Sequence, residues 1–296
     1  MSTTGGGGPW KPRGRRPGGS AGNERPAKPA WTRPRQPPAA PEGLRPDRRA
    51  EQRLHGVNAV KAVFARRPEA IRKLYLTEAR IPDLQPLLKW CVANRVGYRV
   101  VEQDAELARL AGSGHHEGVV ADVLRRPEPA LADWLPQLAP GPQCLLWLDG
   151  VGNPHNLGAI LRSSAHFGVA AVLLPADADL SLSGAAARVA EGGAEAVSLV
   201  RMGPSDSIDL LRSAGFALAA TVVEGGQDLF ATQLPERLVY VVGAEGEGMD
   251  RGLAAECDLA LSIPGSGAVE SLNVASATTV FLAAWARGRV GAGRRD

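Results

Sequence analysis

The sequence predicts an α/β protein whose larger part is a parallel β-sheet covered by helices on both faces. From Cys144 onward, apolar runs of strand length alternate with segments of helical periodicity, a pattern typical of parallel sheets. A shorter alternating region precedes it, and a basic tail rich in proline and glycine comes first. We therefore expect a tail, a small α/β domain and a larger parallel-sheet domain.

The tail holds all of the excess positive charge. Residues 1–50 contain eleven Lys and Arg against three acidic residues, a net charge of +8, whereas the remaining residues sum to −5. Ten prolines, nine glycines and few aliphatic side chains leave too little apolar surface to offset the entropy of ordering. We expect residues 1–52 to be disordered, either as a solvated extension or as a sequence-independent contact with nucleic-acid phosphates.

Other compositional signals exclude several classes of protein. The tail has no apolar stretch for a signal peptide, and no run of about 18 apolar residues follows it. Cys91, Cys144 and Cys257 are far apart and form no Cys-x-x-Cys pair. A zinc site and a disulfide framework are therefore not expected, and a reducing cytoplasm is the expected location.

The small domain is expected over residues 53–126. Helical periodicity covers 56–67, 81–97 and 104–112, with Gly97 and Gly112 as the expected ends of the last two helices and Asp104 as a cap. Strand-like runs cover 73–78, 98–103 and 115–123. The proline-bearing segment 127–142 is the expected linker to a domain over 143–296.

In the larger domain we expect strands near 144–150, 170–175, 196–201, 216–223, 238–243 and 259–263. A helix within "SLNVASATTVFLAAWARGRV" is expected to be the last element. Ligands of parallel sheets bind beyond the carboxyl ends of the strands. The turns that follow the first, fifth and sixth strands are therefore the places to look for chemistry.

The first of these turns is "DGVGNPHNLG", residues 149–158. A dinucleotide fingerprint would place a third glycine at 155, where His155 stands, so a standard nicotinamide site is disfavoured. Asn156 is expected to cap the helix that follows. Arg162 has two expected placements. It lies on the solvent-exposed face of that helix, or it reaches back to the turn, since helical side chains lean toward the N-terminus.

The turn after the fifth strand, "VVGAEGEGMD", combines three glycines with Glu245. Its backbone groups are expected to be open to a ligand, although an acid near a helix N-terminus has a simpler explanation in the helix dipole. The turn after the sixth strand, "SIPGSGAVESLN", contains Ser271 and Asn273, either of which can cap the last helix.

Taken together, "NLGAILR", "VVGAEGEGM" and "SIPGSGAVESLNVASA" resemble, in order, three motifs of the SpoU (TrmH-type) family of RNA ribose 2′-O-methyltransferases in the SPOUT superfamily. The resemblance extends from about Arg53 to the C-terminus, because "GHHEGVVADV" is similar to the family's junction after its recognition domain. The tail lies outside it.

The resemblance implies a SPOUT-type α/β fold with a C-terminal trefoil knot, preceded by a small α/β RNA-recognition domain. It implies S-adenosyl-L-methionine bound in that knot, a homodimer, and RNA as the partner. Backbone groups near Gly243, Ile263 and Leu272 match the positions that hold the cofactor in the family, and Thr221 is expected to line the same pocket.

The resemblance also implies a catalytic group of five residues. We expect Arg162 to bind the phosphate of the target nucleotide and to stabilise the developing alkoxide, with Asn156 orienting the ribose or Arg162. Glu245 is expected to position Arg162, and Ser271 and Asn273 to support the cluster. A guanidinium with a pKa above about 12 is a poor base, so a phosphate or a water is expected to take the proton. No metal is expected.

The function predicted is therefore transfer of a methyl group from S-adenosyl-L-methionine to a ribose 2′-hydroxyl of rRNA or tRNA. The alternative is a non-catalytic RNA-binding or ribosome assembly factor that keeps the methyltransferase fold. A nicotinamide oxidoreductase comes third, because the glycine spacing is broken.

Overall fold

The computed structural model describes residues 50–203, 206–244, 246, 248–287 and 289. The expected disordered segment 1–52 lies outside these residues except for its last three, and Glu245 also lies outside them.

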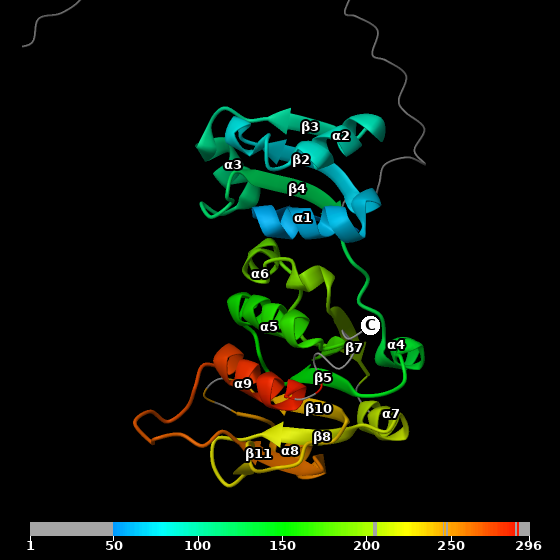
Figure 1. The fold of residues 1–296 in the computed structure, drawn as a ribbon, viewed down its shortest axis with the longest axis vertical. Coiled ribbons are helices and arrows are strands. Elements are labelled where there is room, and N and C mark those ends of the chain that lie inside the picture. Colours follow the sequence, from blue (N-terminus) through cyan, green and yellow to red (C-terminus); the bar gives the residue numbers. More distant parts are fainter. Residues whose placement is uncertain (1–49, 204–205, 245, 247, 288, 290–296) are drawn as a thin grey trace, which may run out of the picture. The chain divides into compact units, whose positions relative to one another are not determined.

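The first part of the described chain is a sheet in the order β1-β4-β2-β3 (Figure 1). Its strands are β1 (Glu51–His55), β2 (Ile71–Leu76), β3 (Gly97–Val100) and β4 (Val119–Leu124). The helices that connect them are α1 (Val57–Arg66), α2 (Gln85–Ala93) and α3 (Asp104–Ala111), with short 3-10 turns at Pro68–Ala70 and Glu78–Arg80. Strands β1 and β2 pair with β4 antiparallel, and β3 pairs with β2 in parallel.

The structure corrects three local expectations in this region. Strand β1 was not expected, and it begins two residues before the predicted boundary at residue 53. Gly97 does not end a helix: α2 stops at Ala93, and Gly97 is the first residue of β3. Asp104 is the first residue of α3 and Gln103 is its cap, whereas Gly112 ends α3 with a φ of 64°, as predicted.

The segment expected to be a linker packs against the second sheet. It contains α4 (Leu131–Trp134) and a 3-10 turn at Leu135–Gln137. Leu131 is buried in an apolar cluster with strand residues, and Ala130 forms a parallel bridge to Arg201. The Arg201 guanidinium lies 2.7 Å from the carboxylate of Glu128.

In the remainder of the described chain, seven strands form a sheet in the order β7-β6-β5-β10-β8-β11-β9, and every pairing in it is parallel. Its members are β5 (Gln143–Leu148), β6 (Ala171–Pro175), β7 (Ser198–Met202), β8 (Ala217–Thr221), β9 (Gln227–Asp228), β10 (Arg237–Val242) and β11 (Leu259–Ser262). The predicted parallel sheet and its six strands are confirmed, and β9 is an addition.

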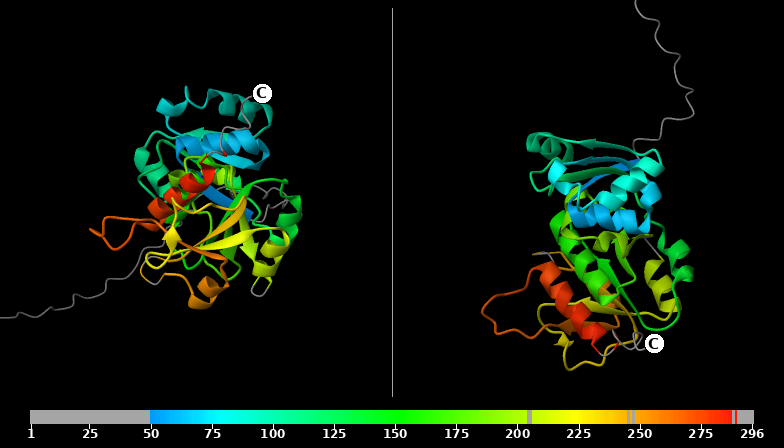
Figure 2. Two further views of the ribbon diagram at one scale, coloured as in Figure 1. Left: turned by 60° about the horizontal axis from the view of Figure 1, so that its bottom comes forward. Right: turned by 45° about the horizontal axis from the view of Figure 1, so that its top comes forward.

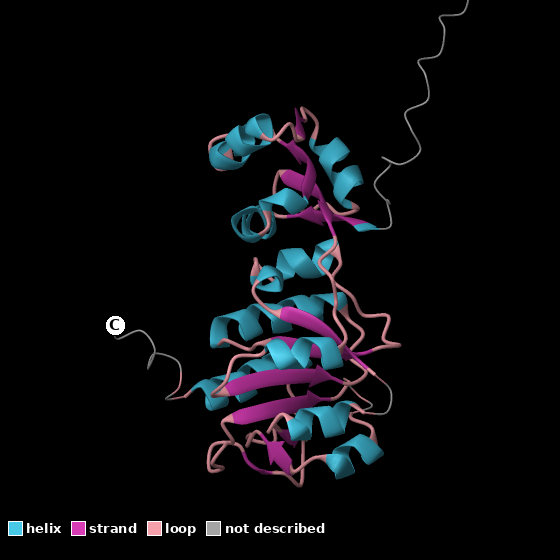
Figure 3. Cartoon of the chain, turned by 90° about the vertical axis from the view of Figure 1, so that its right-hand side faces the viewer, coloured by secondary structure: helices cyan, strands magenta, loops and turns pink. Residues whose placement is uncertain are grey.

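Helices cover both faces of this sheet (Figure 3). Helices α5 (Pro154–Phe167), α6 (Gly184–Val189) and α9 (Val274–Ala286) share a core with Leu146 and Leu148, and the same core extends into the four-stranded sheet. Helices α7 (Ser207–Ser213) and α8 (Arg251–Glu256) pack with α4 on the opposite face, where Leu145 points. No helix among the described residues has the length and apolar character needed to cross a membrane.

Candidate active site

The order of the strands in the sheet brings together the turns that contain the candidate site residues. Strands β5, β10, β8 and β11 are neighbours in the sheet and all run in the same direction. Their carboxyl ends therefore lie along one edge, although the residue that follows β5, Asp149, precedes the residue that follows β11, Ile263, by 114 positions in the chain (Figure 1). We call the segments after β5, β10 and β11 the first, second and third turns.

The first turn leads from β5 into α5. The helix begins at Pro154, and the side chain of Asn153 accepts a hydrogen bond of 2.8 Å from the backbone N–H of His155. The expectation that Asn156 caps this helix is therefore wrong: Asn156 lies within the first turn of α5. Proline is favoured at the first helical position, since its fixed φ suits the helix and its missing N–H would have no helical partner there. An Asn directly before a Pro was the signal that could have identified the cap.

Asn156 instead contacts the third turn. Its Oδ1 accepts a hydrogen bond of 3.2 Å from Nδ2 of Asn273. Oδ1 of Asn273 accepts from the backbone N–H groups of Ala275 and Ser276 and so caps α9, as predicted for this residue or for Ser271. Two candidate residues that are 117 positions apart are thus joined directly.

The second turn is fixed by backbone contacts. Ala244 and Gly248 exchange two backbone hydrogen bonds of 2.9 and 3.1 Å. Gly243 is packed so closely that a Cβ atom there would lie 2.5 Å from the carbonyl carbon of Gly248 and from the backbone nitrogen of Met249. The turn therefore requires a glycine at 243.

The first and second turns also touch. The carboxylate of Asp149 accepts a hydrogen bond of 3.0 Å from the backbone N–H of Asp250. On the other side of β10, the hydroxyl of Thr221 donates to the carbonyl oxygen of Val241 at 3.0 Å. These contacts connect the carboxyl ends of β5, β10 and β8, and the residues Asp149 and Asp250 were not singled out from the sequence.

The third turn extends away from the sheet before it enters α9 (Figure 2). Ile263 is half-buried at its start, residues 264–273 are exposed, and 47% of the surface of Leu272 is accessible. The turn therefore offers backbone donors and acceptors together with the apolar side chains of Ile263 and Leu272. This combination suits a ligand that is partly apolar and partly polar.

Arg162 lies on the exposed surface of α5, two turns after the start of the helix. One side of α5 contacts α9 through the Asn156–Asn273 bond and a 2.8 Å hydrogen bond between the hydroxyls of Ser163 and Thr279. Within the described part of the chain, Arg162 and Ser271 make no hydrogen bond to the other candidate residues. The structure thus joins Asn156 to Asn273 and holds Thr221 beside β10, and it leaves the Arg162 side chain facing solvent.

What the site can do follows from these groups. It offers a cation, several amides and hydroxyls, and turns with accessible backbone groups, which together suit a phosphate-bearing ligand and a polar cofactor. No cluster of three or more His, Cys, Asp or Glu side chains suited to a metal ion occurs among residues that the structure describes.

Comparisons with known proteins agree with this description. The SpoU rRNA Methylase family matches residues 143–283, and the family described as RNA 2′-O ribose methyltransferase substrate binding matches residues 53–129. The chain is 41% identical to the uncharacterized tRNA/rRNA methyltransferase YfiF of Escherichia coli O157:H7, over 83% of this chain and 71% of that one. It is 36% identical to the 23S rRNA (guanosine-2′-O-)-methyltransferase RlmB of Pseudomonas syringae, over 78% of this chain and 93% of that one.

Two solved structures share the fold. The SpoU methyltransferase AviRb from Streptomyces viridochromogenes, solved with AdoMet, superposes with a TM-score of 0.68 at 24% identity, over 82% of this chain and 92% of that chain. An AdoMet-bound rRNA methyltransferase from Sinorhizobium meliloti also gives a TM-score of 0.68 at 24% identity, over 82% and 90% of the two chains. The family matches, the relatives and the shared fold lead to one conclusion: the chain belongs to the SpoU rRNA methylase family.

Proposed function

We propose that this protein is an S-adenosyl-L-methionine-dependent RNA methyltransferase that transfers a methyl group to a ribose 2′-hydroxyl of rRNA or tRNA. The observation that carries the proposal is the hydrogen bond between Asn273 and Asn156, which joins the third turn to the first. A non-catalytic RNA-binding protein would have no need to hold a substrate-facing amide against the turn that offers a cofactor site.

We place the cofactor among the second and third turns and the end of β8. Backbone groups near Gly243, Ile263 and Leu272 would hold it, with Thr221 lining the pocket. The fit rests on exposed backbone donors and acceptors beside the half-buried Ile263, a combination that suits an adenosine with a polar tail. When bound, the cofactor supplies an electrophilic methyl group.

In this proposal Arg162, Asn156, Glu245, Ser271 and Asn273 serve the RNA. Arg162 binds the phosphate of the target nucleotide and stabilises the negative charge that develops on the 2′-oxygen. Asn156, held by Asn273, orients the ribose, while Glu245 positions Arg162 and Ser271 supports the same side of the site. The proton leaves to a phosphate or to water, because a guanidinium is a poor base.

The architecture around this site is part of the proposal. We expect the second turn, the third turn and α9 to form a trefoil knot, and the protein to act as a homodimer. The match of residues 143–283 to the SpoU rRNA Methylase family supports the knot, which the resemblance to that family implied. Light scattering of the purified protein, with a mass twice that of the chain as the expected result, tests the dimer.

The other segments provide RNA recognition. We assign residues 53–126 to substrate recognition, 127–142 to the connection, 143–296 to methyl transfer and the basic segment 1–52 to salt-sensitive contact with phosphates. The match of residues 53–129 to a substrate-binding family supports the first assignment. An rRNA or tRNA substrate implies a cytoplasmic enzyme.

The test is transfer of labelled methyl groups from S-adenosyl-L-methionine to RNA by the purified protein, with and without Arg162→Ala. We expect the variant to lose transfer while its cofactor affinity, measured by calorimetry, is kept. Full activity of Arg162→Ala would contradict the assignment of Arg162. A wild-type protein that binds RNA but no cofactor would show the non-catalytic alternative. Nucleoside mass spectrometry of RNA from cells with and without the protein identifies the target.

A further inference from the structure

A short 3-10 turn, η6 (Gly193–Glu195), is packed between α1 of the four-stranded-sheet region and α5 of the candidate site. A Cβ atom at Gly192 would lie 2.9 Å from Cβ of Ala62 in α1, and one at Gly193 would lie 2.7 Å from the carbonyl oxygen of Leu161 in α5. Gly192 also has a φ of 89°, which disfavours any other residue. The turn can therefore pack against α1 and α5 only with glycine at positions 192 and 193.

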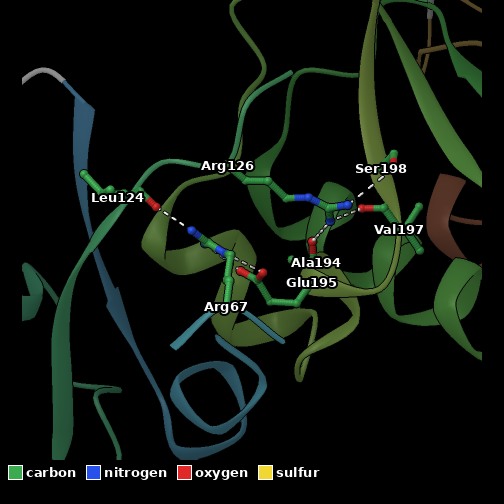
Figure 4. A network of polar contacts seen from close by, with 7 residues as sticks. All are labelled: Arg67, Leu124, Arg126, Ala194, Glu195, Val197 and Ser198. Atoms are coloured by element: carbon green, nitrogen blue, oxygen red, sulfur yellow. Dashed lines mark hydrogen bonds and ion pairs between the residues drawn. The ribbon is translucent and has the colours of Figure 1, made fainter. Parts of the chain in front are cut away.

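A bidentate ion pair joins η6 to the four-stranded-sheet region (Figure 4). Arg67, at the end of α1, donates from Nε and Nη2 to the two carboxylate oxygens of Glu195 at 2.7 and 2.8 Å. Its Nη1 donates to the carbonyl oxygen of Leu124, at the end of β4, at 2.6 Å. The side chains of Arg67 and Glu195 are only 15% and 4% exposed. This geometry uses both Glu195 oxygens and fixes the turn against two elements at once.

A second arginine, two residues after the end of β4, holds the same turn. Arg126 donates from Nη1 to the carbonyl oxygens of Ala194 and Val197 at 3.2 and 2.9 Å (Figure 4). Burial lowers the pKa of Arg126, and the charge of Glu195 opposes that shift. Glu195 thus lies between two guanidinium groups, and both belong to segments that precede the seven-stranded sheet in the chain.

The first residue of η6, Gly193, lies against the backbone of Arg162. A Cβ atom at Gly193 would lie 3.0 Å from Cα of Arg162 and 2.7 Å from the carbonyl oxygen of the residue before it. These are backbone atoms of a helix and cannot rotate away. A shift of η6 by a fraction of an ångström is therefore transmitted to the position from which the Arg162 side chain starts.

We propose that Arg67, Glu195 and Gly193 are positioning residues for Arg162. In this proposal, which rests on the proposed function of Arg162, the ion pair clamps η6 against α5, and η6 sets the helix backbone at the residue that contacts the RNA. Docking of the RNA-recognition region and alignment of the catalytic arginine are thereby linked through one turn. Misplacement of a reacting group by about 1 Å can reduce a rate by about 100-fold.

The test compares Arg67→Lys and Glu195→Gln with Glu128→Gln in the full-length chain. Glu128 and Arg201 form a second half-buried arginine–carboxylate pair at 2.7 Å, which joins the connecting segment to β7 and, among the described residues, makes no hydrogen bond to η6. We measure the single-turnover rate at saturating RNA and cofactor, the KM for RNA, the cofactor Kd and the Tm. Glu195→Gln leaves a buried guanidinium without its carboxylate, so if that variant does not fold, Arg67→Lys, which keeps the positive charge, carries the comparison.

We expect Arg67→Lys and Glu195→Gln to lower the single-turnover rate by about 10- to 100-fold, with the cofactor Kd within about twofold of wild type. Glu128→Gln is expected to lower the Tm and to leave the rate within about twofold. Gly193→Ala, which pushes directly on the α5 backbone, is expected to reproduce the rate loss with the ion pair intact.

If the Arg67 and Glu195 variants lose only Tm or RNA affinity, as Glu128→Gln does, the pair is structural and the proposal is wrong. A wild-type rate in a folded Gly193→Ala variant overturns it equally. Failure of the proposed function is distinguishable from both outcomes, because the wild-type protein itself would then transfer no methyl group to RNA.

Discussion

The side chains of Asn273 and Asn156 meet in a hydrogen bond of 3.2 Å, donated by Nδ2 of Asn273 to Oδ1 of Asn156. The same Asn273 uses its Oδ1 to cap α9. The side chain of Asn273 thus caps the last helix with its oxygen and links the third turn to the first with its nitrogen. A carboxylate or hydroxyl at position 273 could cap the helix, but a carboxylate could not donate the second bond.

This dual use predicts that Asn273→Asp and Asn273→Ala separate stability from activity. Asp keeps the cap, so we expect the free energy of unfolding of Asn273→Asp to stay within about 0.5 kcal/mol of wild type, whereas Asn273→Ala loses about 1 kcal/mol. Both are expected to lose methyl transfer, because neither can donate to Asn156. Denaturant unfolding and methyl-transfer assays check the pair.

Ser183→Ala is the matched control for that prediction. Ser183 caps α6 by accepting a hydrogen bond from Ala186 at 3.1 Å and belongs to none of the three turns. Its removal is expected to cost about 1 kcal/mol of stability while activity remains. If Asn273→Asp keeps wild-type activity, the Asn273–Asn156 bond has no functional role.

A second prediction concerns the glycine that closes the second turn. Ala at 243 would place its Cβ 2.5 Å from backbone atoms of Gly248 and Met249, so the turn must move. We expect Gly243→Ala to lose about 1–3 kcal/mol of stability and at least about tenfold in cofactor affinity, equivalent to about 1.4 kcal/mol. Gly97→Ala, at a position with no atom within 4 Å of the added methyl, is the control. Equal cofactor affinities of the two variants would place the cofactor elsewhere.

A third prediction concerns Thr221, whose hydroxyl donates to the carbonyl oxygen of Val241. Thr221→Val keeps the shape of the side chain and removes the donor, which we expect to cost about 1–2 kcal/mol of stability. The cofactor Kd is expected to rise, because the ends of β8 and β10 are no longer tied beside Gly243. Thr221→Ser keeps the hydroxyl and should bind the cofactor as wild type does; weaker binding by Thr221→Ser than by Thr221→Val would contradict this explanation.

A fourth prediction concerns the acid stability of the packed region around His55. Burial lowers the pKa of His55 below its ordinary value of 6.5, and the nearby Arg188 and His116 lower it further. The folded state therefore binds this proton less tightly than the unfolded state, so stability is kept above about pH 6.5 and lost as the pH falls below it. We expect the free energy of unfolding to decrease between pH 7 and pH 5 by less in His55→Asn than in wild type.

His166→Asn is the control for the pH dependence, because His166 is exposed at the end of α5 and is not among the charged groups that shift the pKa of His55. It is expected to follow the wild-type curve. Should His55→Asn and His166→Asn show the same slope as wild type, the acid sensitivity arises from other groups.

Local sequence signals were sufficient where a structure depends on near neighbours. Apolar runs of strand length located β5, β6, β7, β8, β10 and β11, because all of these except β11 are buried along most of their length and need no polar alternation. Gly112 ended its helix for the conformational reason expected of glycine. The three motifs identified the family because their residue types and order recur together, and the SpoU match over 143–283 confirmed that reading.

The errors occurred where two local signals competed. Asn156 and Asn153 are both good caps, and Pro154 decided between them by fixing the first helical position. Strand β1 is a mixed polar and apolar run that becomes a strand only because β4 pairs with all five of its residues. Gly97 begins β3 because β2 offers a partner there, with Lys73 opposite it in the register.

By itself the sequence determined the fold class, the order of the elements and the turns that carry polar residues, since these follow from composition and periodicity along the chain. Tertiary structure alone decided which of those residues meet. The Asn273–Asn156 bond exists because α9 packs against α5, and the Arg67–Glu195 pair because α1 packs on η6. Contacts between residues more than 100 positions apart depend on the packing of whole elements, which no local pattern encodes.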